Sequence, residues 1–453
     1  MDSILLRKIW GRKGILIREE RNKMRKMKDS GIEWIGEIPE NWKIRRIKTL
    51  FQLRNEKSFK PLNEVNLISL YTDKGVLQHS DIEYVAGNKA SNADGYKCVY
   101  EDDIVVNIIL CWMGAIGRSA YTGVTSPAYD IYKPCPGTDS RFYHYYFRTK
   151  GFNGECFQRG RGIMLMRWRT YAEDFMDIKV CFPSLPEQKQ IADYLDKKVS
   201  EIDSTISKTR ESIEEYKKLK QSIITEVVTG KVKIENGKVC GKYDTYKDSG
   251  IEWIGEIPEE WECFYLSQIF TPVKNKNIGL IENNLLSLSY GKIIRKNIET
   301  TFGLLPENFE GYNIIQENDI VLRLTDLQND HKSLRVGIAK EKGIITSAYL
   351  TLRNQTNKIA KYFYYLLHSF DIAKGFYGMG AGVRQGLNWN EVRSLRMIAS
   401  KDISEQQQIA DYLDQKCSEI DNLITKKEQL VVELEAYKKS LIYEVVTGKR
   451  SVI

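Results

Sequence analysis

Two stretches of the chain carry the apolar pattern of long, paired helices. From Leu195 to Val227, apolar residues recur at alternating steps of four and three, which is the seam spacing of a left-handed coiled coil. The same spacing returns 218 residues later, from Leu413 to Val445. Lys220, Lys427 and Lys438 interrupt the seams. We therefore predict two long helices that pair through an interface that is not purely apolar.

The two helices belong to a longer internal repeat, which guides the prediction of the architecture. The shared blocks are KDSGIEWIGEIP at 28–39 and 247–258, QIADYLD at 190–196 and 408–414, and EVVTGK at 226–231 and 444–449. The stretches 45–185 and 264–403, which the blocks flank, differ strongly from each other. A common frame with two divergent middles predicts one duplicated unit that presents two different recognition surfaces.

Both divergent stretches mix short strands with one helical segment, which favours an α+β head in each repeat. Strand patterns are found at 66–71, 103–110, 128–132 and 177–182 in the first head and at 285–290, 319–324, 348–352 and 395–399 in the second. Helical patterns are found at 140–150 and 358–370. The predicted fold is α+β, with two globular heads joined by two antiparallel coiled-coil helices and related by a pseudo-two-fold axis.

The predicted domain order alternates heads and helices. The segments are a basic leader at 1–27, head one at 28–185, helix one at 186–230, a linker at 231–246, head two at 247–403 and helix two at 404–450. Helix two leaves head two and can meet helix one only by running back along it. We therefore expect the helices to be antiparallel.

The net charge of the chain is concentrated in its leader. Residues 1–28 contain ten of the 68 Lys and Arg and three of the 60 Asp and Glu, so they account for +7 of the formal charge of +8. Overall charge is therefore weak evidence for a nucleic-acid partner. The leader is predicted to be either a disordered arm that binds phosphates or the product of a misplaced translation start, because Met24 and Met27 directly precede the first repeated block.

The sequence shows no recognisable catalytic or metal centre. The eight cysteines form no CxxC pair and stand at no metal-ligand spacing from the four histidines, so we expect reduced, mostly buried thiols. Motifs for phosphate loops, dinucleotide binding, zinc hydrolysis, amino-methyl transfer and DNA cleavage are absent. No apolar segment is long enough to span a bilayer. We expect a cytoplasmic protein with no membrane contact, no cofactor and no enzymatic activity of its own.

Loops with side chains suited to DNA occur at equivalent places in both heads. Arginine grips phosphates or reads guanine, Asn and Gln pair with adenine, and glycine lets the backbone approach the duplex. In head one the candidates are Asn107 and Arg118 after the second predicted strand, and Arg159, Arg161, Arg167 and Arg169 in a Gly-Arg segment. In head two they are Arg323, Gln328, Asn329 and Lys332 after the corresponding strand, and Arg384, Gln385 and Asn388 beside a glycine cluster at 378–382. The heads are thus predicted to read different bases, although turns and solvated arginines remain the alternative.

The blocks KDSGIEWIGEIPxxW, EQxQIADYLD and EVVTGK, in the order head, helix, head, helix, resemble the specificity subunit of Type I restriction-modification systems over about residues 28–450. The resemblance implies that each head is a target-recognition domain for one half of an asymmetric, bipartite site in double-stranded DNA, and that the helices fix the spacer. It also implies partner subunits. These are two methyltransferase subunits that bind S-adenosylmethionine and methylate adenine, and restriction and translocase subunits that use ATP and Mg.

Apolar residues on the outer faces of the helices are candidates for contact with such partners. They are Ile191, Tyr194, Leu219, Ile224, Tyr412, Tyr437 and Ile442. An alternative role for them is packing against the chain's own heads. Two other classes of protein also stay open, namely a stand-alone sequence-specific DNA-binding regulator and a coiled-coil scaffold for proteins, and the scaffold predicts no salt-dependent affinity for DNA.

Overall fold

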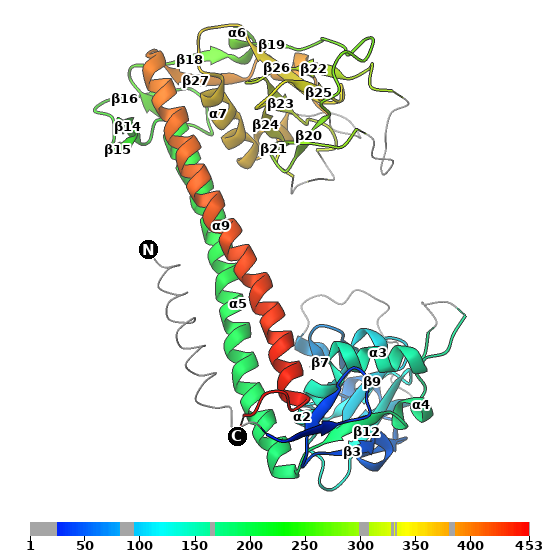
Figure 1. Cartoon of the computed structure of the whole chain (residues 1–453). Coiled ribbons are helices and arrows are strands. Elements are labelled where there is room, and N and C mark those ends of the chain that lie inside the picture. The colour runs from blue at the N-terminus through cyan, green and yellow to red at the C-terminus, as the bar shows by residue number, and fades with distance from the viewer. Residues whose placement is uncertain are drawn as a thin grey trace. The chain divides into compact units, whose positions relative to one another are not determined.

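The chain folds into two compact units (Figure 1). The computed structural model describes residues 25–81, 95–163, 168–298, 308–327, 330, 333–379 and 386–452. Unit 1 comprises residues 1–208 and 430–453, and unit 2 comprises residues 209–429. Each unit therefore contains one head together with one end of each long helix. The predicted leader lies outside the described residues up to residue 24.

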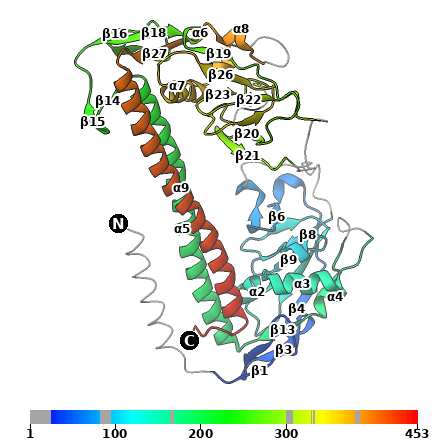
Figure 2. The same cartoon turned by 45° about the horizontal axis from the view of Figure 1, so that its top comes forward.

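The two predicted long helices are confirmed. Helix α5 spans Leu185–Val228 and helix α9 spans Ile403–Val446, with 44 residues each, which corresponds to about 66 Å at 1.5 Å per residue. In each unit the start of one helix lies beside the end of the other, so the pairing is antiparallel (Figures 1 and 2). Among the described residues, neither these helices nor any other helix has the length and hydropathy of a membrane span.

The lysines that interrupt the predicted seams are paired with the opposite helix. The ammonium group of Lys220 lies 2.7 Å from Asp421, and that of Lys438 lies 2.5 Å from Asp203. The ammonium group of Lys427 lies 5.5 Å from the ring centre of Tyr216. Between them, buried Ile213, Ile420 and Ile424 form an apolar cluster. The interface is therefore a mixed seam, in which each lysine stem covers apolar surface while its ammonium group meets a carboxylate or a ring.

The head of unit 1 is built on an antiparallel four-stranded sheet in the order β10-β9-β12-β4. The strands of this sheet are β4 (Phe51–Arg54), β9 (Ile104–Asn107), β10 (Ile116–Arg118) and β12 (Tyr129–Pro134). The other elements of the head are β1 (Met27–Asp29), β2 (Glu37–Pro39), β3 (Lys43–Arg46), β5 (Lys57–Ser58), β6 (Ile68–Tyr71), β7 (Gly75–Gln78), β8 (Tyr96–Val99), β11 (Gly123–Thr125), β13 (Lys179–Phe182), α2 (Ser140–Phe147), α3 (Lys150–Arg159) and α4 (Ala172–Met176). Helices α2 and α3 place Phe142, Phe147 and Phe152 in the core, where these rings are fully buried.

The head of unit 2 repeats this sheet with different residues. Its order β19-β26-β23-β24 uses β19 (Phe270–Pro272), β23 (Ile320–Leu322), β24 (Val336–Ile338) and β26 (Leu350–Asn354). The segment predicted as a linker contains the strand pair β14 (Lys233–Glu235) and β15 (Lys238–Gly241). The other elements of the head are β16 (Tyr246–Asp248), β17 (Glu256–Pro258), β18 (Trp261–Tyr265), β20 (Leu286–Ser289), β21 (Lys292–Arg295), β22 (Asn313–Ile315), β25 (Gly343–Ile345), β27 (Arg396–Ser400), α6 (Leu266–Ile269), α7 (Ala360–Ile372) and α8 (Trp389–Val392). The predicted α+β class is therefore confirmed, with one shared sheet topology for two divergent sequences.

In each head a buried aspartate directly precedes a central strand of the sheet. Asp103 lies before β9, and it accepts hydrogen bonds from Arg54 Nε and Nη2 at 2.9 and 3.1 Å. Asp319 occupies the same place before β23 and accepts from Arg353 Nε and Nη2 at 2.9 and 2.6 Å. Two-point pairing satisfies a carboxylate that would otherwise be costly to bury.

The repeated blocks are the surfaces with which heads and helix ends contact each other. In unit 1, Gly448 just after α9 lies against Pro39 and Trp42 of the first KDSG block. In unit 2, Gly230 just after α5 lies against Pro258 and Trp261 of the second block. Each EVVTGK block therefore packs on the KDSG block of the other repeat, which explains why both blocks are shared while the remainder of the heads is not.

Candidate DNA interface

In each unit, the two segments predicted to contact DNA are joined by an equivalent hydrogen bond. In unit 1 the Thr170 amide, which follows the Gly-Arg segment, donates to the Ile108 carbonyl after β9 at 2.9 Å. In unit 2 the Leu387 amide, after the glycine cluster, donates to the Leu324 carbonyl after β23 at 2.8 Å. In each unit the two segments are therefore neighbours in space although they are far apart in the sequence. They meet where the central strand ends, which is β9 in unit 1 and β23 in unit 2.

The loop after β9 is closed by its own polar groups. Asn107 Oδ1 accepts hydrogen bonds from the amides of Ile109 and Leu110 at 3.0 and 3.2 Å, and the Asn107 amide donates to the Ala115 carbonyl at 3.0 Å. Gly114 lies in the left-handed region at φ 93°, which few other residues adopt without strain. The side-chain oxygen of Asn107 therefore shapes the loop and is not free to read a base.

The Gly-Arg segment forms a hairpin held by a tryptophan. The main-chain groups of Arg161 and Arg169 exchange two hydrogen bonds of 2.8 and 3.0 Å. Trp168 stacks on Phe157 with ring centres 5.4 Å apart and donates from Nε1 to the Phe157 carbonyl at 2.9 Å. A Cβ atom at Gly160 would overlap the Trp168 ring, so this glycine is required for close packing. These contacts hold the main chain of Arg161 and Arg169 in place.

The arginines of this segment differ in how much they are exposed. Arg161 leaves 65% of its side chain exposed and pairs with Asp174 at 2.5 Å, while Arg159 is 36% exposed and lies 3.7 Å from Glu155. Ile163, at the described tip of the hairpin, is 99% exposed. Arg167 lies outside the described residues. Pairs at exposed positions are weak, so Arg161 and Arg159 can exchange their carboxylates for phosphates.

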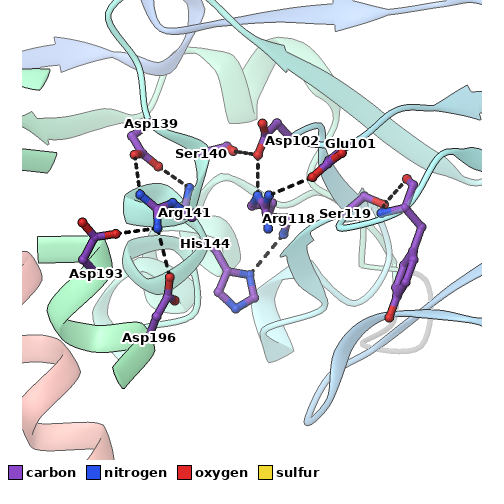
Figure 3. A network of polar contacts seen from close by, with 11 residues as sticks. Glu101, Asp102, Arg118, Ser119, Asp139, Ser140, Arg141, His144, Asp193 and Asp196 are labelled. Carbon is purple, nitrogen blue, oxygen red and sulfur yellow. Dashed lines mark hydrogen bonds and ion pairs between the residues drawn. The ribbon is translucent and has the colours of Figure 1, made fainter. Parts of the chain in front are cut away.

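Arg118 is not in the loop where the sequence suggested it. It ends β10 opposite Ile104, whereas the loop begins beyond Asn107 at the other end of β9. Its Nε donates to Asp102 Oδ1 at 2.5 Å, and its amide donates to His144 Nδ1 at 3.1 Å (Figure 3). The predicted position was wrong because the chain turns back after Asn107 and returns along β9 as β10, whereas contact of Arg118 with DNA stays a prediction.

A polar network fixes the head of unit 1 to helix α5 (Figure 3). Arg141 on α2 donates to Asp193 at 2.7 Å and to Asp196 at 3.2 Å, both on α5. Tyr145 Oη donates to Asp196 at 2.7 Å. In unit 2, Lys361 and Tyr365 of α7 contact Asp414 of α9 in the same way, at 2.8 and 2.7 Å. The last aspartate of each QIADYLD block is therefore an attachment point for a head.

Histidines on these head helices stay neutral near pH 7. Burial and the neighbouring cations Arg148 and Arg118 lower the pKa of His144 to about 3. Burial and Lys220 lower the pKa of His368 on α7 to about 4. An unfolded histidine titrates near pH 6.5, so protonation favours the unfolded chain in both cases.

The free energy of unfolding is therefore expected to fall as the pH drops below about 6.5, by about 1–2 kcal/mol per histidine between pH 7 and pH 5. In the variant His144→Gln, the amide oxygen can still accept from the Arg118 amide but no ring titrates. Urea unfolding at both pH values should show a smaller pH dependence for His144→Gln than for the matched variant His79→Gln. An equal dependence in the two variants would contradict the assignment.

In unit 2, two of the predicted residues are described and have local partners. Arg323 follows β23, is 33% exposed and lies 3.7 Å from Asp330 Oδ2. Asn388 caps α8 and accepts from the Asn390 amide at 2.8 Å. Five predicted residues lie outside the described residues, namely Gln328, Asn329, Lys332, Arg384 and Gln385. The predicted base contacts of unit 2 therefore stay predictions, while the described ends of both loops have fixed partners.

Sequence reasoning missed the residue that organises this region of unit 2. Arg335 is fully buried, and its guanidinium donates to main-chain carbonyls on both sides of the loop after β23. No motif surrounds it, because a single arginine before a short strand looks like any surface arginine. Only the tertiary contacts distinguish it.

The residues predicted to bind partner subunits fall into two groups. Ile191, Ile224 and Tyr412 are buried in the core of their own units, and Tyr194 and Ile442 pack partly against it. Leu219 and Tyr437 keep 49% and 39% of their surface exposed. Ile191, Ile224 and Tyr412 offer no surface to another protein because they are buried, whereas contact of the other four residues with partner subunits stays a prediction.

All eight cysteines are free thiols, and four of them are buried: Cys111, Cys156, Cys181 and Cys417. Cys240 and Cys263 are exposed, so the expectation of mostly buried thiols holds for half of the set. In the described part of the chain, no cluster of His, Cys, Asp and Glu has the arrangement of a metal site.

Comparison with known proteins gives a consistent result for this architecture. Residues 39–215 match the family described as "Type I restriction modification DNA specificity domain". The "Putative type I restriction enzyme MjaX specificity subunit" of Methanocaldococcus jannaschii is 24% identical over 442 residues, covering 92% of this chain and 95% of that protein.

Two solved structures share the fold. One, from a study of complex assembly and conformational transition of the type I R-M system, has a TM-score of 0.63 at 11% identity and covers 91% of this chain and 99% of its own. The other, the HsdS subunit from Thermoanaerobacter tengcongensis, has a TM-score of 0.51 at 12% identity and covers 91% and 98%.

The fold defines a class of protein in which two globular heads pack against the ends of two long helices and each head presents two adjoining loops. Within that class, the chain carries a match to the DNA specificity domain of Type I restriction-modification systems at 39–215 and is similar over most of its length to a specificity subunit of such a system. The resemblance found in the repeated blocks is thereby confirmed.

Proposed function

We propose that this chain is the non-catalytic subunit that selects the DNA site of a Type I restriction-modification complex, and that each head reads one half of an asymmetric, bipartite sequence. The observation that carries this proposal is the equivalent pair of joined loops, Ile108 with Thr170 in unit 1 and Leu324 with Leu387 in unit 2. One scaffold with two different sets of loop residues suits the reading of two different half-sites.

The two target-recognition domains are assigned to residues 28–185 and 247–403, joined by the helical segments 186–230 and 404–450 and by the linker 231–246. In unit 1, exposed Arg161, together with Arg159 at the end of α3, supplies contacts to phosphates or guanine. In unit 2, Arg323 has the corresponding role beside loop residues that include Gln328 and Asn329. Asn107 is assigned to loop closure, and Arg118 to pairing with Asp102 at the end of β10.

The chemistry is assigned to other subunits. Two methyltransferase subunits would bind S-adenosylmethionine and methylate adenine, and restriction and translocase subunits would use ATP and Mg. Leu219 and Tyr437, which expose 49% and 39% of their surface on the long helices, are the candidates for contact with such subunits. Phosphate contacts from partner subunits would also explain why a chain with a formal charge of only +1 outside residues 1–28 can belong to a DNA-binding complex.

Mapping of methylated adenine in genomic DNA tests this proposal. Cells that carry the chain together with the methyltransferase encoded beside it are compared with cells that lack this chain alone. We expect a bipartite motif that disappears with the chain. Methylation that persists unchanged would instead favour a stand-alone DNA-binding regulator or a protein scaffold.

A further inference from the structure

Arg335 of unit 2 uses all of its side-chain donor groups inside the protein. Its Nη1 donates to the carbonyls of Arg323 and Thr325 at 3.1 and 2.8 Å, and its Nη2 donates to those of Asp326 and Asp330 at 3.3 and 2.6 Å. The residue is 0% exposed. A buried guanidinium is stabilised only when its donors are satisfied, so these bonds fix the main chain of the loop that follows β23.

The remaining donor connects this loop to the second one. Arg335 Nε donates to Tyr377 Oη at 3.1 Å, and Tyr377 Oη donates to the Asp330 carbonyl at 3.0 Å. Tyr377 lies in the 3-10 turn Gly375–Gly378, where the predicted glycine cluster begins. A hydroxyl that both accepts and donates therefore ties the two segments together.

The base of this assembly is anchored in the core of the head. The Arg335 amide donates to Asp371 Oδ2 at 2.6 Å, and Asp371 is 2% exposed on α7. The Leu387 amide adds the third link, to the Leu324 carbonyl at 2.8 Å. The main chain of Arg335 thus bonds to α7 and its side chain bonds to both loops, so a displacement of one loop must break bonds that also hold the other.

We propose that Arg335, acting with Tyr377, is a positioning residue that holds the two DNA-reading loops of unit 2 in one arrangement and thereby sets the base specificity of this unit. The inference rests on the proposed function, since it concerns how an assigned recognition surface is shaped. Arg335 itself does not contact DNA, because its donors are already used and it is buried.

Unit 1 uses a different device, which makes it an internal control. The main-chain amide of Asn107 donates to the Ala115 carbonyl, and the main-chain amide of Arg323 donates to the Arg335 carbonyl. Ala115 of unit 1 is therefore equivalent in position to Arg335 of unit 2. Alanine has no donor side chain, and the shorter loop is closed by Asn107 Oδ1 instead. Specificity is therefore expected to depend on a buried arginine in unit 2 alone.

The test compares two tyrosine variants of unit 2 in the full chain, with its methyltransferase partner, by mapping methylated adenine. Tyr377→Phe removes the oxygen that ties the loops. Tyr362→Phe is the matched control, because its buried hydroxyl donates to the Val228 carbonyl at 3.0 Å, away from the loops. We expect Tyr377→Phe to lower the discrimination at one or more bases of one half-site about three- to tenfold, with the other half-site unchanged and the Tyr362→Phe motif intact.

A charge-retaining variant separates positioning from electrostatics. Arg335→Lys keeps the positive charge but has three donors in place of five and no planar fork. Relaxation of the same half-site by Arg335→Lys supports positioning, whereas an intact motif would show that the charge alone suffices and would overturn the proposal.

The other outcomes are equally decisive. Equal relaxation in Tyr377→Phe and Tyr362→Phe would mean that any lost hydroxyl acts through the stability of the head, and would overturn the positioning role. An unchanged motif in Tyr377→Phe would overturn it as well, while the bipartite motif of the wild-type chain would leave the proposed function standing. Absence of any chain-dependent motif in the wild type would instead remove the proposed function.

Discussion

A chain in which residues 262–401 replace residues 43–183 is expected to direct its methyltransferase partner to a motif built from two copies of the half-site read by unit 2. The exchange places a second copy of one head on the frame of unit 1. It is expected to fold because the attachment points are shared. Lys361 and Tyr365 of the incoming head would meet Asp196 in place of their present partner Asp414, and the Ile359 amide, which now donates to Gln406 at 3.1 Å, would meet Gln188.

The junctions follow from the strand pairing. Strand β3 pairs with β13 in unit 1, and β18 pairs with β27 in unit 2, so each exchanged segment must carry both strands of its pair. The reciprocal exchange, with residues 43–183 in place of 262–401, is the control and should duplicate the other half-site. Mapping of methylated adenine reads both results. A motif that keeps both original halves in either chimera would contradict independent reading by the two heads.

The second large effect is expected on stability, at the glycines that follow the long helices. Gly230 has φ 72°, and a Cβ atom there would overlap the ring of Pro258. Gly230→Ala is therefore expected to lower the free energy of unfolding by about 2–4 kcal/mol, because a left-handed alanine costs about 1 kcal/mol and the overlap costs about 1–3 kcal/mol further. Urea unfolding measures the change.

The matched control for this variant lies in the same unit. Gly237 has φ 70°, nearly the same backbone, but no atom lies within 4 Å of the position that a Cβ would take. Gly237→Ala should cost only about 1 kcal/mol, the price of the backbone conformation. In unit 1 the same comparison is available between Gly448 and Gly31. Equal losses in the two variants of either unit would show that contact with the proline ring contributes nothing.

The candidate site could be located from the sequence more readily than its residues could be assigned. Glycine and arginine clusters pointed to two loops in each head, and hydrogen bonds such as that from Thr170 to Ile108 show that these loops adjoin. The roles of single residues did not follow, because Asn107 and Arg118 are as suited to DNA by type as Arg161 is. Whether a side chain closes a loop, pairs with Asp102 or stays exposed depends on neighbours that composition does not reveal.

The sequence by itself determined the long helices, the main predicted strands and the duplicated frame. These features have a short period, a short apolar run or an exact repeat, so they can be recognised along the chain: steps of four and three at the seams, the apolar runs of β9 and β23, and the shared blocks. Each EVVTGK block also places a glycine directly after its helix, and both glycines adopt the positive φ that is common at a helix end.

Only the tertiary structure decided which parts meet. Tyr443 donates to the Trp34 carbonyl across 409 residues, and Lys449 donates to the Glu37 carbonyl across 412. Such contacts leave no periodic trace in the sequence, because each depends on the whole path of the chain between the partners. The same reason applies to Arg335. A lone arginine acquires its role only when β23, α7 and two loops enclose it, since five donors must then be satisfied without water.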